Sequence, residues 1–408
     1  MPIALFVLGL TIFSLGTTEF MIAGLLPELS EAFDVSIPAA GMLISAFAVG
    51  AAVGAPAVAL VASKVPKKAT LVTLLVVFLA GQVLAATAQS YNVLLVARVV
   101  TAVVQSAFFG IGAVVAADLV PPAKRASAIA IMFGGLTLAT IAGVPLGAFL
   151  GQHWGWRAPF WAVTALALLG LVGVITLIPH QPRDESASIR DELAAFRNGK
   201  MWLALATTAF SQAALFGAYS YITPLLTDIT GFSSGVVPIL LVLFGVGTLC
   251  GSFLGGRFAD RNLMRTLCVG MVLLGVILAL FSATAHNKPL MVITLIVFGV
   301  AGFLINPGLQ TRVLNEAGGA ATLASAGNIS AFNIGNAAGP WIAGLAISGG
   351  YGYLSPSWVG AAFAVLALGT ALLGASRDRA GRGATGDGRP AATGEAVLVT
   401  ADSSPVKG

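Results

Sequence analysis

The sequence has 408 residues, of which 57% are hydrophobic and only 9% are charged, and its formal net charge is +5. Soluble domains carry about 25% charged residues, so this chain is too poor in charge to cover a water-exposed surface of its size. The composition therefore excludes a soluble enzyme, a nucleic-acid-binding protein and a disordered chain, and it indicates a protein that crosses a membrane several times.

Long apolar runs follow one another along the chain. A helix needs about 20 mainly apolar residues to cross a bilayer, whereas the strands of a membrane β-barrel would give short alternating segments. Twelve runs of sufficient length lie, in chain order, at 2–27, 38–62, 69–88, 92–117, 126–150, 158–179, 201–226, 236–256, 266–285, 289–311, 322–349 and 355–375. We therefore expect an all-α membrane protein with twelve transmembrane helices, of which the first is a true span and not a cleaved signal.

The basic residues predict the orientation of these spans. With both termini in the cytoplasm, 18 of the 21 Lys and Arg residues fall on the cytoplasmic side, and the exceptions are Arg98, Arg157 and Lys288. This bias follows the positive-inside rule, so we expect a multi-pass protein of the cell (plasma) membrane with both termini cytoplasmic. The same bias explains the positive net charge without a nucleic-acid partner.

Two polar segments predict how the chain is divided. The expected parts are an N-terminal six-helix bundle at 1–179, a cytoplasmic linker at 180–200, a C-terminal six-helix bundle at 201–375 and a disordered cytoplasmic tail at 376–408.

An internal repeat relates the two predicted bundles. A shift of 197 residues places Pro27 on Pro224 and Lys64 on Arg261. Transporters built from parallel repeats hold their substrate between the two halves near the membrane midplane. The alternative is that glycine-rich membrane helices align by chance.

Glu19 and Arg98 are the charged residues that lie well inside predicted spans. A charge at the membrane centre costs about 2.5–3.5 kcal/mol, so such residues usually serve a function. At about 1.5 Å per residue, Glu19 lies about 12 Å and Arg98 about 9 Å from the outer ends of their spans. We expect Glu19 to be a proton switch that Arg98 or water stabilises when it is ionised; the alternative is a static Glu19–Arg98 bridge that fixes helix orientation.

Polar and aromatic side chains inside the spans predict a substrate cavity. Transporter sites combine apolar and aromatic walls with a few polar groups, and amides in lipid demand partners. The expected cavity residues are Phe13, Thr17, Gln105, Phe109, Thr137, Gln212, Phe216, Tyr219, Tyr221, Asn306, Gln310, Asn328, Phe332 and Asn333. The alternatives are aromatic rings that face lipid or the core, and amides that bond neighbouring helices. Amides, rings and a single acid suit a neutral amphiphile.

Two related loops follow the second and eighth predicted spans. The segments Ala59–Lys68 and Gly256–Arg261 resemble the G-x-x-x-D-R-x-G-R-R pattern of the major facilitator superfamily, and the resemblance covers nearly all of residues 1–375. In that family the loop latches the cytoplasmic faces of the helices. The first copy has Ser63 where the family has an acid, so we expect Asp118 to replace it by pairing with Lys64 or Lys68. The expected latch residues are Lys64, Lys68, Asp118, Asp260 and Arg261; alternatively, these are solvated loop charges.

Glycine and proline residues mark the fifth and eleventh predicted spans. They resemble the Gly/Pro motif of antiporters in the superfamily, and they comprise Gly143, Pro145, Gly147, Gly339 and Pro340. Glycine lets helices approach closely and proline bends them, so helix packing alone is the alternative role.

A distinctive string in the first predicted span narrows the resemblance. Gly16–Pro27, supported by Trp154–Trp161 and Ser330–Gly335, is similar to the drug:proton antiporter (DHA1) branch, and most of all to chloramphenicol-efflux proteins. The resemblance implies proton-coupled efflux of a small neutral amphiphilic drug, chloramphenicol above all, by alternating access. The alternative is an exporter of a metabolite such as a sugar or a purine nucleoside.

The remaining reactive residues do not form a cluster. His153, His180 and His286 lie at loops, and Cys250 and Cys268 are isolated, so a membrane-embedded enzyme is only a remote alternative. The sequence contains no G-x-x-x-x-G-K-[ST] loop, so ATP is not the expected energy source. Two similar halves favour alternating access over a channel. We expect a monomer in the lipid bilayer, with a small-molecule substrate and protons as partners and with no cofactor or metal.

Overall fold

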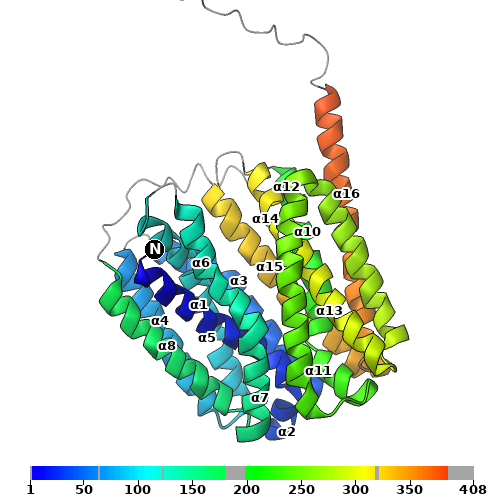
Figure 1. Ribbon diagram of the computed structural model, residues 1–408, viewed down its shortest axis with the longest axis horizontal. Coiled ribbons are helices and arrows are strands. Elements are labelled where there is room, and N and C mark those ends of the chain that lie inside the picture. Colours follow the sequence, from blue (N-terminus) through cyan, green and yellow to red (C-terminus); the bar gives the residue numbers. More distant parts are fainter. Residues whose placement is uncertain (1, 63–64, 122–123, 180–197, 318–320, 385–408) are drawn as a thin grey trace, which may run out of the picture.

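The structure is a computed structural model that describes residues 2–62, 65–121, 124–179, 198–317 and 321–384. Nearly all of these residues are helical, and no strand occurs among them (Figure 1). The helices up to residue 179 are α1 (Ile3–Phe20), η1 (Met21–Gly24), α2 (Leu26–Phe33), α3 (Ile37–Ala62), α4 (Lys67–Ala86), α5 (Tyr91–Asp118), α6 (Arg125–Leu138), η3 (Ala139–Gly143), α7 (Val144–Trp154) and α8 (Ala158–Leu177).

The second set of helices begins at Gly199. It consists of α10 (Gly199–Tyr219), α11 (Ile222–Pro224), η5 (Leu225–Ile229), η6 (Ser234–Val236), α12 (Val237–Thr284), α13 (Lys288–Leu304), α14 (Asn306–Glu316), α15 (Ala321–Ala346), η7 (Ile347–Tyr351) and α16 (Ser355–Ala384). Of the short elements, η1 and η6 are 3₁₀ turns, whereas η3, η5 and η7 are π-helical turns.

The described helices confirm the prediction of an all-α membrane protein. Ten helical stretches are long and apolar enough to span a membrane. One of them, Ser234–Thr284, has 51 residues, and its backbone leaves helical geometry at Asn262, so it provides two crossings. The more polar α15, with 26 residues, is long enough for one more.

Several boundaries differ from the prediction. The expected loop at 257–265 is absent because α12 turns at Asn262 itself, whose side chain accepts a hydrogen bond from the backbone of Arg265 at 3.0 Å and starts the next helix. Helix α16 continues past residue 375 to Ala384. Residues 180–197 and 385–408, most of the predicted linker and tail, lie outside the described residues, and the domain boundaries stay predictions.

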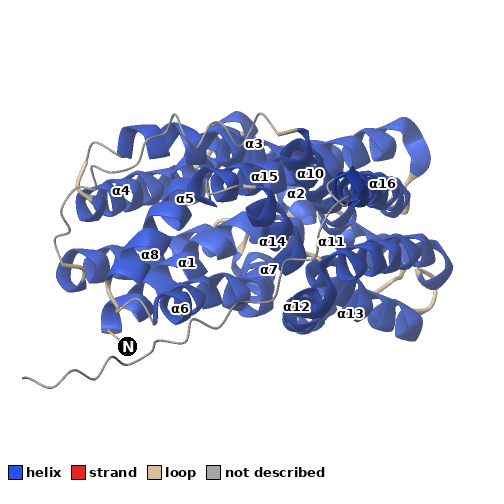
Figure 2. Cartoon of the chain, turned by 90° about the horizontal axis from the view of Figure 1, so that it is seen from above, coloured by secondary structure: helices blue, strands red, loops and turns tan. Residues whose placement is uncertain are grey.

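The helices pack in two groups that match the order of the chain. In the first group α1 packs on α6 and α8, and α5 packs on α3 and α4; in the second, α10 packs on α15 and α16, and α12 packs on α13. Seen from above, the two groups occupy opposite sides of the molecule (Figure 2). This arrangement is the pair of pseudo-symmetric bundles that the repeat predicts.

The two groups touch along three seams. Helix α3 lies along α15, α7 and η3 lie against α12, and η1 contacts α11 and α12. Figure 1 shows α2, α7 and α11 together at one end of the molecule, which we call the α2–α11 end; the N-terminus and the end of α16 lie at the opposite, terminus end. Ser330 donates to the carbonyl of Ala52 at 3.0 Å across the α3–α15 seam.

Candidate functional site

The first span is interrupted directly after Glu19. Helix α1 ends at Phe20 and a 3₁₀ turn follows, so backbone carbonyls in the last turn of α1 lack their usual helical donors. Arg98 on α5 supplies them: Nη1 donates to the carbonyl of Thr18 at 2.6 Å and Nη2 to that of Glu19 at 3.3 Å. A cation at a helix C-terminus also interacts favourably with the helix dipole. Arg98 therefore holds the break in place.

The environment of Arg98 is otherwise almost dry. Its side chain is only 1% exposed, and its guanidinium carbon lies 4.1 Å from the centre of the Phe47 ring. Gln82 on α4 donates to the hydroxyl of Thr18 at 2.5 Å. Side chains from α3, α4 and α5 thus converge on the end of α1.

The Glu19 carboxylate has a neutral partner. Gln105, seven residues after Arg98 on α5, donates from Nε2 to Oε2 of Glu19 at 2.7 Å. Among the described side chains, the guanidinium of Arg98 donates to backbone oxygens and forms no ion pair with this carboxylate. Arg98 therefore bonds the main chain at Thr18 and Glu19, and the roles expected for Glu19 and Arg98 stay predictions.

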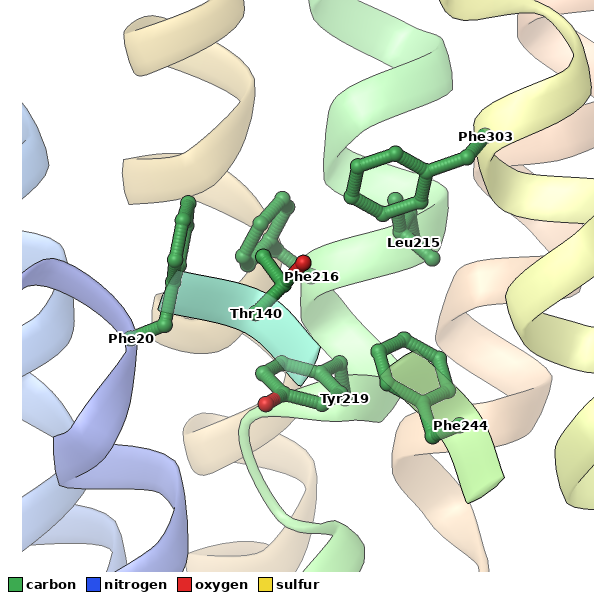
Figure 3. A pocket seen from close by; sticks show the side chains of 7 residues that line it. All are labelled: Phe20, Thr140, Leu215, Phe216, Tyr219, Phe244 and Phe303. Carbon is green, nitrogen blue, oxygen red and sulfur yellow. The ribbon is translucent and has the colours of Figure 1, made fainter. Parts of the chain in front are cut away.

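An aromatic pocket lies between the two helix groups, and Phe20, the residue after Glu19, is one of its walls. It is lined by Phe20, Thr140, Leu215, Phe216, Tyr219, Phe244 and Phe303 (Figure 3). Phe20 of α1 stacks on Phe216 of α10 with ring centres 5.7 Å apart, and Tyr219 stacks on Phe244 at 4.7 Å. The enclosed volume is about 10 Å³, which is about the space of one water molecule. The rings thus close the pocket, and the side chains of both groups would have to part to admit a ligand.

Four of the expected cavity residues lie around α1 and its neighbours. Thr17 donates to the carbonyl of Phe13 at 2.7 Å within α1, and the carbonyl of Thr137 accepts from Thr140 at 2.8 Å. Phe109 packs edge-on against Phe133, with ring centres 6.1 Å apart. None of these four lines the described aromatic pocket.

Tyr221 lies elsewhere than expected. Its hydroxyl donates to the carbonyl of Pro340 at 3.1 Å and lies against Gly41 of α3 and Gly344 of α15. It therefore belongs to the seam between the groups, and only Phe216 and Tyr219 of the expected aromatic residues line the pocket.

The expected amides form two hydrogen-bonded groups in the second set of helices. Gln212 on α10 donates to Asn306 at the start of α14 at 2.9 Å. Asn328 on α15 accepts from Thr208 at 2.8 Å and donates to Gln310 at 2.5 Å. These bonds tie α10, α14 and α15 together, which supports the alternative role that the sequence offered for amides.

Two further expected residues lie on α15. Asn333 donates to the carbonyl of Ile329 within its own helix at 2.9 Å. Phe332 is half-buried and packs against the main hydrophobic core.

Sequence reasoning missed five pocket residues and one polar neighbour: Phe20, Thr140, Leu215, Phe244, Phe303 and Gln82. Phe20 directly follows Glu19 and Thr140 is one turn from Thr137, so their proximity along the chain was a usable signal. Phe244 and Phe303 enter from α12 and α13, and an apolar span contains no signal for which ring faces inward.

The glycines of the Gly/Pro motif permit close packing on α1. A Cβ atom at Gly143 would clash with the hydroxyl of Thr17, and one at Gly147 would press on Met21. Pro145 follows the π-helical turn η3, and such turns often accompany functional sites.

The equivalent contact in the second group joins α10 and α15. A Cβ atom at Gly339 would meet the backbone of Ala213 and Gly217 on α10. Pro340 lies inside α15, and its carbonyl is the acceptor of the Tyr221 hydroxyl.

The charges at the terminus end pair differently from the expected latch. Asp118 has a lysine partner, but it is Lys67, with Nζ 3.0 Å from Oδ2. Lys68 instead donates to the carbonyl of Ile175 near the end of α8 at 2.7 Å. Lys64 lies outside the described residues, and Asp260 and Arg261 are exposed on α12.

Comparison with known proteins identifies relatives along nearly the whole chain. The model of the Major Facilitator Superfamily matches residues 8–340. The inner membrane transport protein YdhP of Escherichia coli (strain K12) is 43% identical over 364 residues, which is 89% of this chain and 94% of that protein. A chloramphenicol resistance protein of Streptomyces lividans is 37% identical over 373 residues, covering 90% of this chain and 95% of that protein.

A solved structure shows the same fold. A bacterial homolog to the human lysosomal transporter Spinster superimposes with a TM-score of 0.72 at 19% sequence identity, over 91% of this chain and 96% of that one.

Proposed function

The chain belongs to the major facilitator superfamily and is a multi-pass membrane transporter, not an enzyme, and from this premise we propose that it exports a small neutral amphiphile in exchange for protons. The cargo that we propose first is chloramphenicol, because a relative of 37% identity is a chloramphenicol resistance protein. The protein acts as a monomer in the inner membrane, with both termini in the cytoplasm.

The observation that carries the proposal is the position of Glu19. Its carboxylate is hydrogen-bonded to Gln105 at 2.7 Å, and the next residue, Phe20, is a wall of the aromatic pocket between the helix groups. Because Glu19 directly precedes a residue that lines the cargo site, its carboxyl group can respond both to protonation and to cargo binding. Differential binding of the two ligands to the two states is what couples their movements.

The polarity of the site favours an uncharged cargo. The pocket is lined by four phenylalanine rings, the phenol ring of Tyr219, the hydroxyl-bearing Thr140 and an aliphatic side chain, and the amides of Gln212 and Asn306, which bond each other, are neutral. When the single carboxylate of Glu19 is protonated, the site has no second negative charge that could bind a cation. Aromatic rings and amides are complementary to chloramphenicol, which is a neutral nitroaromatic diol with an amide group.

Alternating access requires that one end of the interface between the helix groups face the outside of the cell. We assign the α2–α11 end to the outside, because Glu28, Glu31 and Asp34 lie there and the basic residues gather at the terminus end. Thr223 donates to the carbonyl of Ala23 at 2.9 Å across this outer seam. The structure then corresponds to the state closed to the outside, and parting of η1 and α11 opens it.

The test begins with drug susceptibility. A pump-deficient bacterial host that expresses this chain is expected to tolerate more chloramphenicol than the host with an empty vector. In inverted membrane vesicles, chloramphenicol is expected to dissipate a preset pH gradient, and Glu19→Gln is expected to abolish this effect. Glu31→Gln is the matched control, since Glu31 is exposed outside the spans. Undiminished coupling in Glu19→Gln would refute the proton assignment.

A metabolite exporter is the second candidate, and the amide pair favours it. Gln212 and Asn306 bond each other through one hydrogen bond, so each amide keeps further capacity for a hydroxylated or heterocyclic cargo. If tolerance of chloramphenicol does not change, reduced accumulation of a radiolabelled pentose or purine nucleoside in the same host would favour this candidate.

A further inference from the structure

Gln105 carries a buried atom that its present hydrogen bond does not explain. The side chain is 2% exposed; Nε2 donates to Glu19 at 2.7 Å, but Oε1 is buried and accepts no hydrogen bond from any described residue. An unsatisfied buried acceptor is costly, and in a native structure it calls for an explanation.

The chemistry of Glu19 supplies that explanation. An ionised carboxylate only accepts hydrogen bonds, whereas a protonated carboxyl group also has an O–H that must donate. An amide can serve both forms, because a half turn about its terminal bond exchanges N–H₂ and C=O with almost no change of shape. This terminal torsion is broad and roughly two-fold, so neither orientation is strained.

We propose that the Gln105 amide follows the proton on Glu19: it donates from Nε2 to the carboxylate, and after a half turn it accepts from the carboxylic acid through Oε1. The inference rests on the proposed proton coupling and assigns to Gln105 a positioning role in it. Protonation then moves one proton onto Glu19, and the hydrogen bond that the carboxylate accepts from Nε2 is exchanged for one that the carboxylic acid donates to Oε1.

No other described neighbour can take this part. Arg98 bonds the backbone at Thr18 and Glu19, but a guanidinium has donors only, and two of its N–H groups are engaged by these carbonyls. Gln82 is a second buried amide whose Oε1 also has no described partner, but its Nε2 donates to the Thr18 hydroxyl and not to Glu19. The ring of Phe20 stacks on that of Phe216, which has no hydrogen-bonding group.

An amide at Gln105 that changes its orientation when Glu19 is protonated can also contribute to transport. In the protonated state the amide nitrogen turns away from Glu19 toward its surroundings on α5, so a proton that arrives from outside changes the polar surface presented beside the pocket. Coupling through Gln105 therefore needs no movement of Arg98, which stays on the broken end of α1.

The experiment is infrared difference spectroscopy between high and low pH on the full-length protein in membranes, with glutamine labelled by ¹³C at the side-chain amide. We expect a carboxylic acid band that Glu19→Gln removes and an amide band that shifts with the same midpoint. Gln105→Met, which keeps the length of the side chain without its polar atoms, is expected to remove the amide shift. Gln82→Met is the matched control and is expected to retain it.

Transport provides the second readout. In Gln105→Met we expect proton-driven efflux to fall by about tenfold, while the thermal midpoint shows that the protein is folded. If Glu19 gives no acid band, the proposed proton coupling fails. If the acid band is present but the amide band is static or survives Gln105→Met, the coupling stands and the role of Gln105 is refuted.

Discussion

The two halves of the molecule share a backbone and differ in chemistry. In both, the first helix is interrupted at the α2–α11 end, after Phe20 in one half and after Tyr219 in the other. With the 197-residue shift, however, Glu19 corresponds to Phe216 and Arg98 to Leu295. One half thus holds the charges at the break, and the other holds rings.

The difference extends to the filling of space. Gln105 corresponds to Gly302, and Leu215 of α10 occupies the place where a side chain at Gly302 would lie. In the second half a leucine from the neighbouring helix therefore occupies the space at the glycine, whereas the first half has the Gln105 side chain at the equivalent position. Duplicated halves can keep one fold and still divide the tasks of proton binding and cargo binding.

Arg98→Leu should break the comparison most strongly, because it gives the first half the residue type of the second. Two backbone carbonyls lose their donors, and we expect a loss of about 3 kcal/mol in the free energy of unfolding. Thermal unfolding in detergent followed by tryptophan fluorescence measures it. Leu295→Met is the control at the equivalent position, and an unchanged midpoint in Arg98→Leu would contradict the capping role.

Phe216→Leu should separate the two tasks. It removes one ring from the stack with Phe20, and aromatic pairs contribute about 0.5–1.5 kcal/mol beyond burial, so we expect KM for the cargo to rise by about tenfold. The number of protons moved per cargo molecule should stay constant. A changed ratio in vesicle flux measurements would show that the ring is part of the proton machinery.

Thr223→Val tests the seam that joins the halves. Loss of its bond to Ala23 should shift the equilibrium toward opening at the α2–α11 end by about fivefold, since one hydrogen bond contributes about 1 kcal/mol. Distances between spin labels on α2 and η5 would report the shift. Thr227→Val is the control, because Thr227 bonds only within its own half, and equal populations in both variants would remove Thr223 from the seam.

Glu28→Gln should have the smallest effect and sharpens the comparison at a position where the other half has Leu225. Burial is the main cause that raises the pKa of Glu28 above 4.5, so the folded protein binds this proton more tightly than the unfolded chain and loses stability as pH rises through the folded pKa. At pH 7–8 we expect Glu28→Gln to melt about 2 °C higher. The gain should vanish below pH 4.5, and a gain independent of pH would assign it to another cause.

Much of the fold could be predicted because the bilayer constrains it. Spans of about 20 apolar residues and the bias of Lys and Arg indicate the crossings without reference to packing. The breaks after Phe20 and at Asn262 escaped prediction, since they depend on donors from distant residues such as Arg98 or on a single local cap. An apolar run in the sequence predicts the length of a membrane span but not whether its helix is continuous.

The site was predictable to the extent that charge is rare in a membrane. Glu19, Arg98 and Gln105 are conspicuous in an apolar span, and the structure brings them together. Their connectivity was not predictable, because the main-chain acceptors of Arg98 exist only where α1 ends. Lys67 and Lys68 are adjacent in sequence, and only the turn of α4 decides which of them reaches Asp118.

The seam between α3 and α15 has a mechanical consequence. Contacts hold it near one end, at Tyr221 with Gly41 and Gly344, and again at Ser330 with Ala52. Because both contacts lie on one pair of helices, α3 and α15 can stay together while the opposite side of the interface, where α7 meets α12, separates. A disulfide engineered across the α3–α15 contact is then expected to leave turnover intact, whereas one across the α7–α12 contact is expected to stop it.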